Sequence, residues 1–152
     1  MTNTEVMTST KIFDAINLPT EAEKQEIVSF LFTNLEQYGD KKEDIRKALD
    51  YALKETPSFG GFVVVAEDDE IIKGVVVVNR TGMSGYIPDN ILVYIATHKE
   101  SRGEGIGKML MEETIAYAKG DIALHVEKDN PAKKLYEKYG FTNPYLEMRL
   151  KR

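Results

Sequence analysis

A glycine-rich turn between a predicted strand and a predicted helix is the feature that most constrains this chain. It runs from Arg102 to Gly107 as Arg-Gly-Glu-Gly-Ile-Gly, after an apolar run over 91–96 and before an apolar-periodic run that begins at Met109. A strand, a glycine turn and a helix N-terminus in succession aim several backbone N–H groups at one point, where the helix dipole adds a positive field. Glycine also removes side chains that would keep an anion away. The segment therefore predicts a cradle for a phosphate or pyrophosphate.

Two common phosphate-binding motifs do not fit this turn. A P-loop requires a glycine where this chain has Arg102, and a hydroxyl residue where it has Met109. A dinucleotide fingerprint requires a third glycine at the position of Lys108 or Leu110, depending on which glycine is counted first. The sequence thus disfavours nucleotide hydrolysis and nicotinamide binding, and leaves an anion cradle or a plain strand–helix turn.

A second segment points to a particular family. Residues 130–141 read Asn-Pro-Ala-Lys-Lys-Leu-Tyr-Glu-Lys-Tyr-Gly-Phe. Arg-x-x-Gly-x-Gly after a strand, followed at this distance by Leu-Tyr-Glu-Lys-x-Gly-Phe, resembles the GNAT superfamily of acyl-CoA-dependent N-acyltransferases. The resemblance covers residues 60–150 well and the first 60 by pattern only. It implies one GNAT-like N-acetyltransferase domain over residues 1–152, with six to seven strands in a mixed, mainly antiparallel sheet, about four flanking helices and splayed central strands.

Composition limits the classes of partner and site. At 152 residues the chain has the size of one domain, and its net charge of −5 argues against nucleic acid as a partner. It has no cysteine and two histidines, so we expect no disulfide, no thiol nucleophile and no metal centre. No apolar run is long enough to span a membrane, and Met1–Thr10 lacks the pattern of a signal peptide. We expect a cytoplasmic protein that is a monomer or a homodimer.

Hydrophobic periodicity predicts helices that flank a mixed sheet, the α/β (α+β) class. The pairs Thr20/Glu23 and Asp40/Glu43 have the spacing of capping boxes, and each precedes an apolar-periodic segment. Strands are predicted over 62–66, 71–78, 91–97, 122–126 and 145–150, with a weaker first strand over 11–18. Residues 67–70 predict a hairpin turn, and the last two helices are predicted over 108–119 and 132–139.

The resemblance implies acetyl-CoA as the co-substrate and identifies the backbone that binds it. The turn would hold the pyrophosphate, mainly through backbone amides of Glu104 to Lys108, while Arg102 touches phosphate or braces the turn. A bulge in the strand over 91–97 would expose main chain that pairs with pantetheine, and one N–H there would polarise the thioester carbonyl. The cofactor-binding residues implied are Ile95, Ala96, Thr97, Arg102, Gly103, Glu104, Gly105, Ile106, Gly107, Lys108 and Asn130.

Tyr136 is the catalytic residue that the resemblance implies. The equivalent family tyrosine donates a proton to the departing thiolate, and packing against the cofactor is the alternative role. Asn130 lies six residues before Tyr136, whereas the family's asparagine usually lies seven before, where this chain has Asp129. We interpret this as a shorter loop, with Asn130 as a cofactor contact.

The general base and the acceptor are left open by the sequence. Many family members carry a glutamate in or just before the central strand, but residues 91–96 contain none, so Asp89, His125, Glu127 or a chain of waters are the candidates. Tyr38, Phe59, Met83 and Tyr86 are candidates for an apolar wall of the acceptor cleft. A small-molecule amine and a peptide amine both remain possible. The predicted function is transfer of acetyl from acetyl-CoA to a primary amine by direct attack; the alternative is an acyl-CoA-binding module with little or no catalysis.

Overall fold

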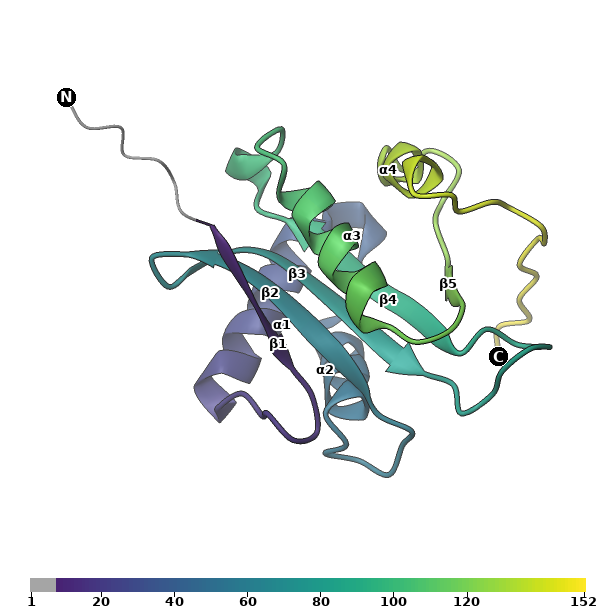
Figure 1. Ribbon diagram of the computed structural model, residues 1–152, viewed down its shortest axis with the longest axis horizontal. Helices are drawn as coiled ribbons and strands as arrows, with labels where there is room; N and C mark the ends of the chain where they lie inside the picture. Colours follow the sequence, from purple (N-terminus) through teal and green to yellow (C-terminus); the bar gives the residue numbers. More distant parts are fainter. Residues whose placement is uncertain (1–7) are drawn as a thin grey trace.

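The computed structural model describes residues 8–152, which form a five-stranded sheet and four α-helices (Figure 1). The elements in chain order are β1 (Ser9–Phe13), α1 (Glu21–Leu35), the 3-10 turn η1 (Glu36–Tyr38), α2 (Lys42–Ala52), β2 (Gly61–Asp68), β3 (Ile71–Arg80), β4 (Asn90–Thr97), the 3-10 turn η2 (Lys99–Ser101), α3 (Ile106–Tyr117), β5 (Ile122–Leu124) and α4 (Ala132–Lys138). The expectation about a signal peptide rests largely on residues 1–7, which lie outside the described part. None of the helices within residues 8–152 has both the length and the apolar character needed to span a bilayer.

The sheet is mixed and mainly antiparallel, as predicted. Its strands follow the order of the chain, β1-β2-β3-β4-β5. The first four are antiparallel to their neighbours, whereas β5 is parallel to β4 because α3 crosses over between them. The predicted hairpin between β2 and β3 is confirmed: Asp69 and Glu70 both adopt positive φ, at 53° and 65°.

The prediction of six to seven strands is wrong, because the sheet has five. From Leu146 to Leu150 apolar and charged side chains alternate, yet residues 145–150 form no strand and every one of them is exposed. The predicted strand over 122–126 is also shorter, since β5 ends at Leu124. Alternation shows that a segment is compatible with a strand, but a strand forms only where a neighbour offers its hydrogen-bonding edge.

Two hydrophobic cores lie on opposite faces of the sheet. Helices α1 and α2 cover one face, and α3 covers the other, with α4 beside it (Figure 1). The run 62–66 is buried throughout because its alternate side chains enter the two cores: Val63 and Val65 face α1 and α2, while Phe62, Val64 and Ala66 face α3. A strand with helices on both faces accordingly reads as a continuous apolar run.

One of the two predicted capping boxes is present. Thr20 caps α1: its hydroxyl accepts from the N–H of Glu23 at 3.1 Å, and its own N–H donates to the Glu23 carboxylate at 2.8 Å. The box predicted at Asp40 and Glu43 is wrong, because α2 begins after Lys41 without a side-chain cap. Asp40 instead accepts a hydrogen bond from a distant tyrosine, so tertiary structure overrides a local signal there.

Candidate functional site

Strand β4 contains a bulge that reverses which side chains face each side of the sheet. Val77 of β3 pairs with Tyr94, whereas the next residue, Val78, pairs with Leu92, so Val93 has no partner of its own. Leu92 consequently packs on the α3 side and Tyr94 on the α1–α2 side, although residues two apart in a regular strand share a face. The bulge predicted for this strand is therefore present.

Beyond the bulge, the edge of β4 that faces β5 is free. The parallel pairing joins residues 90–92 to residues 122–124 and goes no further. Residues 93–97 therefore have no neighbouring strand on that side within the described part of the chain. Since β5 ends at Leu124, the two strands separate where the bulge begins, as the predicted splay requires.

The hydrogen-bond alternation of β4 shows which groups face this gap. The N–H of His98 donates to the carbonyl of Lys73 on β3 at 2.8 Å. Directions alternate along an antiparallel ladder, so Ala96 also turns its N–H toward β3, whereas Ile95 and Thr97 turn theirs toward the gap. The structure thus presents two of the three predicted main-chain groups and does not support a main-chain contact from Ala96.

The glycine turn leaves open space where a ligand can approach. Gly103 and Gly105 have φ of +89° and +82°, which residues with a Cβ rarely adopt, and no atom lies within 4 Å of the position that a Cβ would occupy at either. Gly105 is the N-cap of α3, which begins at Ile106 rather than at the predicted Lys108. The earlier start brings Ile106 and Gly107 into the first helical turn.

Four consecutive backbone N–H groups are available at this helix end. The N–H of Glu104 is used within the turn, where it donates to Ser101 at 3.2 Å, and the N–H of Met109 donates to Gly105 at 3.1 Å. Between them, the N–H groups of residues 105–108 have no acceptor among residues 8–152, as expected for the first turn of a helix. Glu104 therefore shapes the cradle, while the next four residues can bind an anion.

The side chain of Arg102 braces the turn against the end of α1. Its guanidinium donates to the carbonyl of Asn34 at 3.1 Å and to the carboxylate of Glu36 at 3.3 Å. Of the two roles left open for Arg102, bracing is the one that the contacts in this structure favour.

Asn34 is a structural residue that the sequence reasoning missed. It is buried on α1, where its amide donates to the carbonyl of Phe30 at 2.9 Å and accepts from the N–H of Lys99 at 3.0 Å. It thereby ties α1 to η2, directly before the glycine turn. A polar residue within the apolar stripe of the helix was the available signal.

Tyr136 lies on α4 within the α3-side core. Its side chain is only 6% exposed, and it packs in the same cluster as Leu92 of β4, Ile106 of α3 and Ile95 beyond the bulge. Its hydroxyl makes no hydrogen bond within residues 8–152. The hydroxyl oxygen is nevertheless not fully buried, so it still reaches solvent. Burial, and secondly the charge of Glu127, raises the pKa of Tyr136 to about 12. The phenol therefore stays protonated at neutral pH.

Two other residues of the second motif have structural roles. The side chain of Asn130 accepts from the N–H of Ala132 at 2.9 Å and so holds the turn that leads into α4. Tyr139 is half-buried and packs against the α3-side core, and its hydroxyl donates to the carbonyl of Lys108 at 3.4 Å. Helix α4 also approaches the cradle, since a Cβ at Gly107 would lie 3.3 Å from Leu135.

The candidates for the general base stand in different surroundings. Asp89 accepts the N–H of Asp121 at 3.1 Å and lies against Gly120, so its carboxylate holds the entry to β5. His125 is exposed, because β5 ends before it. Glu127 is also exposed, but its charge acts on the hydroxyl of Tyr136.

The residues proposed for an apolar acceptor wall do not form one group. Tyr38 reaches from η1 to the carbonyl of Asp129 at 3.3 Å, while Phe59 lies over Gly82 at the other end of the sheet. Met83 and Tyr86 are exposed on the loop between β3 and β4. Tyr94 belongs to the core, where its hydroxyl donates to Asp40 at 2.6 Å and both burial and that carboxylate raise its pKa.

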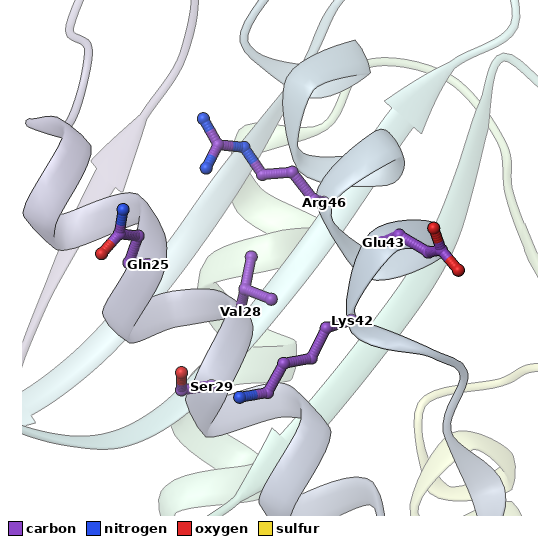
Figure 2. Close-up of a pocket in the computed structure, with 6 residues that line it drawn as sticks. All are labelled: Gln25, Val28, Ser29, Lys42, Glu43 and Arg46. Carbon is purple, nitrogen blue, oxygen red and sulfur yellow. The ribbon is translucent and has the colours of Figure 1, made fainter.

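Two hollows in the structure lie away from the glycine turn. Figure 2 shows the larger, of about 380 Å³, between α1 and α2. Arg46 at its rim is already ion-paired with Glu21 and Asp50, at 2.8 and 2.9 Å. The other, of about 300 Å³, lies between α1 and β1–β3.

No group of three or more His, Cys, Asp or Glu side chains within residues 8–152 is placed to hold a metal ion. The free edge of β4, the glycine turn and Tyr136 therefore form the candidate site.

Comparison with known proteins identifies the family of the chain. Residues 59–143 match the model of the acetyltransferase (GNAT) domain. A curated relative, the 5-NmdU N-acetyltransferase of Pseudomonas phage PaMx11, is 31% identical over 84 residues, which are 54% of this chain and 58% of the relative's length. The chain thus matches little more than half of that relative.

Solved structures share the fold. An aminoglycoside N-acetyltransferase in complex with CoA is 10% identical, with a TM-score of 0.72 over 100% of this chain and 99% of that one. A predicted acetyltransferase with acetyl-CoA from Clostridium acetobutylicum is 19% identical, with a TM-score of 0.66 over 94% of this chain and 96% of that one. With the family model covering more than half of its residues, the chain belongs to the GNAT acetyltransferase family.

Proposed function

We propose that this chain is an N-acetyltransferase that moves the acetyl group of acetyl-CoA to a primary amine by direct attack. The observation that carries the proposal is the free edge of β4 beyond Val93, which shares one core cluster with the first turn of α3 and with Tyr136. Membership of the family and the naming of the phage relative as an N-acetyltransferase support acetyl transfer to nitrogen.

The backbone of this chain fits the donor. The open space beside Gly103 and Gly105 admits a pyrophosphate, and the four free N–H groups of residues 105–108 would bind it with the help of the helix dipole. The N–H groups of Ile95 and Thr97 would pair with the pantetheine arm as a strand edge pairs with a peptide. Acetyl-CoA supplies the activated acyl group; all positioning comes from the chain.

The chemistry sets two demands on these residues. An alkyl ammonium with pKa near 10.4 must lose a proton before it attacks, which costs about 4.6 kcal/mol at pH 7. The developing oxyanion needs a donor, worth roughly 3–4 kcal/mol in comparable sites, and the N–H groups that face the gap are suited to this role. Tyr136 would then give its proton to the thiolate as the carbon–sulfur bond breaks.

Among the candidate bases, we favour Glu127. Its charge is felt at Tyr136, whereas Asp89 is occupied by the N–H of Asp121 and sits before the bulge. Because Glu127 is exposed, it could pass the amine's proton to solvent directly or through a water.

An acyl-CoA-binding module with little or no catalysis is the second candidate. It is favoured by the absence of any carboxylate from β4, residues 90–97, because the resemblance to the family implies a glutamate in or just before this strand in many of its members. The donor side of the site would be the same in both cases, so only turnover separates them.

Two measurements test the proposal. Isothermal titration should detect binding of acetyl-CoA, and an absence of binding at millimolar concentration would exclude both candidates. An assay of CoA release against a panel of amines should then detect turnover with at least one class, and the panel should include lysine, peptide N-termini, small metabolite amines and 5-NmdU. Tight binding with no turnover across the panel would favour the module.

A further inference from the structure

The connection between α1 and α2, residues 36–41, contacts both sides of the gap beside β4. The hydroxyl of Tyr38 donates to the carbonyl of Asp129 at 3.3 Å, in the loop between β5 and α4. The carboxylate of Asp40 accepts a hydrogen bond at 2.6 Å from Tyr94, which follows the bulge in β4. Because Tyr38 and Asp40 are close neighbours in the chain, the connection lies across the gap. It does so on the α1–α2 side of the sheet, where Tyr94 packs.

The same stretch of chain also contacts the donor side of the site. Arg102 of the glycine turn donates to the carbonyl of Asn34 and to the carboxylate of Glu36. The side chain of Asn34 accepts from the N–H of Lys99. The segment from Asn34 to Asp40 therefore contacts η2, the glycine turn, β4 and the loop before α4. All of these parts of the chain border the proposed donor site, so one short segment links them.

Glu36 has a backbone conformation that glutamate rarely adopts. Its φ is 56° and its ψ is −128°, at the point where α1 ends and η1 begins. Such angles suit glycine, because a residue with a side chain is strained at positive φ. Burial does not account for the strain, since the side chain of Glu36 is 42% exposed. A strained residue persists where its surroundings fix it, and such residues gather at functional sites. Here the surroundings are Arg102 and the contacts of the connection.

The glycine turn has few contacts of its own. No atom lies within 4 Å of the position that a Cβ would occupy at Gly103 or Gly105, so the turn is held mainly at its ends, by α3 and by Arg102. Glu36 and Arg102 form an exposed ion pair, which adds little to stability because water screens its attraction. Its main effect is to fix the guanidinium. A site that is already in place loses less conformational freedom when its ligand binds.

We propose that Glu36 is a positioning residue of the donor site. Its carboxylate holds Arg102, and so the start of the glycine turn, while its backbone directs the connection across the gap. The proposal rests on the proposed function, because the donor site is the one described there. Glycine in place of Glu36 would relieve the strain but would lose the carboxylate and free the connection. Stability and donor affinity should therefore change in opposite directions, which a merely structural role would not produce.

Glu36→Gly tests this opposition. The midpoint of urea denaturation should rise because glycine accepts this φ, while the dissociation constant for acetyl-CoA, measured by calorimetry, should increase about tenfold. Glu70→Gly is the matched control: Glu70 also has a positive φ, at 65°, and an exposed side chain, but it lies on the hairpin between β2 and β3. It should raise the midpoint and change the affinity by less than about twofold. An unchanged affinity or a lower midpoint in Glu36→Gly would overturn the proposal.

A double substitution tests whether Glu36 acts through Arg102. Glu36→Gln keeps the length of the side chain but removes its charge, and it should weaken acetyl-CoA binding about three- to fivefold. Arg102→Gln should weaken binding by at least as much. The double variant should bind no more weakly than Arg102→Gln alone, because residues of one network are not independent. If the two effects multiply instead, Glu36 does not act through Arg102 and the proposal fails.

Calorimetry separates this proposal from the proposed function, because it measures binding rather than turnover. If Glu36→Gly weakens acetyl-CoA binding while no amine is acetylated by the unmodified protein, acetyl transfer fails and the positioning role stands. If amines are acetylated but Glu36→Gly binds acetyl-CoA as tightly as the unmodified protein, the positioning role alone fails. An absence of binding to the unmodified protein removes both.

Discussion

Tyr136 and Tyr139 lie one helical turn apart, yet their hydroxyl groups have different surroundings. The ring of Tyr136 is buried in the core and its hydroxyl has no protein partner among the described residues, whereas the hydroxyl of Tyr139 lies near Lys108 and Glu112 on α3. A hydroxyl that is held at a core but unpaired is available to a bound reactant. This contrast supplies a matched pair of substitutions.

Tyr136→Phe should lower kcat by about 10²-fold, in the range of general acid catalysis, because the ring remains but the proton donor is lost. The dissociation constant for acetyl-CoA should change by less than about threefold, since only a hydroxyl is removed. Steady-state kinetics and calorimetry measure the two quantities. Tyr139→Phe is the control and should leave kcat close to that of the unmodified protein; an unchanged kcat in Tyr136→Phe would remove Tyr136 as the acid.

The raised pKa of Tyr136 predicts the shape of the pH profile. With a pKa of about 12 the phenol keeps its proton throughout the stable range, so Tyr136 causes no loss of activity as the pH rises. The amine acceptor, by contrast, becomes more reactive as it loses its proton towards pH 10. We expect kcat/KM for the amine to rise from pH 7 to about 10 without a descending limb. A descending limb centred below pH 9 that disappears in Tyr136→Phe would contradict this.

At the scale of elements, the proposed cradle lies where the glycine turn leads into α3. Gly105 provides the left-handed residue that lets α3 begin at Ile106, and bracing by Arg102 and Asn34 connects the preceding residues to α1. The proposed donor site thus depends on the end of α1, which is more than 60 residues away in the sequence from the turn that it braces.

Gly105→Ala tests the cradle. The new Cβ enters the open space beside the free N–H groups, and the left-handed conformation costs about 1–2 kcal/mol. Gly85→Ala is the matched control: Gly85 also has positive φ, at +77°, and open space around its Cβ position, but it lies on the loop between β3 and β4. Both variants should lose similar stability on urea denaturation, while only Gly105→Ala should weaken acetyl-CoA binding, by about tenfold or more. Equal affinities would argue against the cradle.

At the scale of the whole molecule, the sheet separates two cores, and two of its glycines occupy closely packed positions. Gly74 lets α3 pack closely, since a Cβ there would lie 2.7 Å from Leu110 and 2.8 Å from Ile106. Gly61 has a different constraint, because its Cβ would collide with the backbone carbonyl of Val78. Side-chain ends can move aside, whereas a paired strand cannot.

Gly61→Ala should therefore destabilise the protein more than Gly74→Ala. Overpacking against movable side chains typically costs about 1–3 kcal/mol, which we expect for Gly74→Ala. Gly61→Ala must displace the backbone of β2 from β3 and should exceed that range or prevent folding. Chemical denaturation of the two variants gives the comparison, and a larger loss in Gly74→Ala would contradict the packing described here.

The site was predictable where its parts are local in sequence. The glycine turn, the helix after it and Tyr136 on a short helix could be placed from the order of residues, because each depends on neighbours within a few positions. The braces could not be placed in this way: Asn34 meets Lys99 across 65 residues, and Tyr94 meets Asp40 across 54. Which face a side chain occupies after Val93 also depended on pairing with β3, since one extra residue inverts the alternation.

The sequence alone thus determined the family, the glycine turn before α3, the Thr20 cap and the mixed sheet with helices on both faces. Tertiary structure decided the number of strands, the use of Asp40 and the end of the pairing between β4 and β5. The physical reason is that helix caps and glycine turns are satisfied by groups close in the chain, whereas a strand is completed by a partner elsewhere. Residues 145–150 have the pattern of a strand, and the fold of one chain leaves them without that partner.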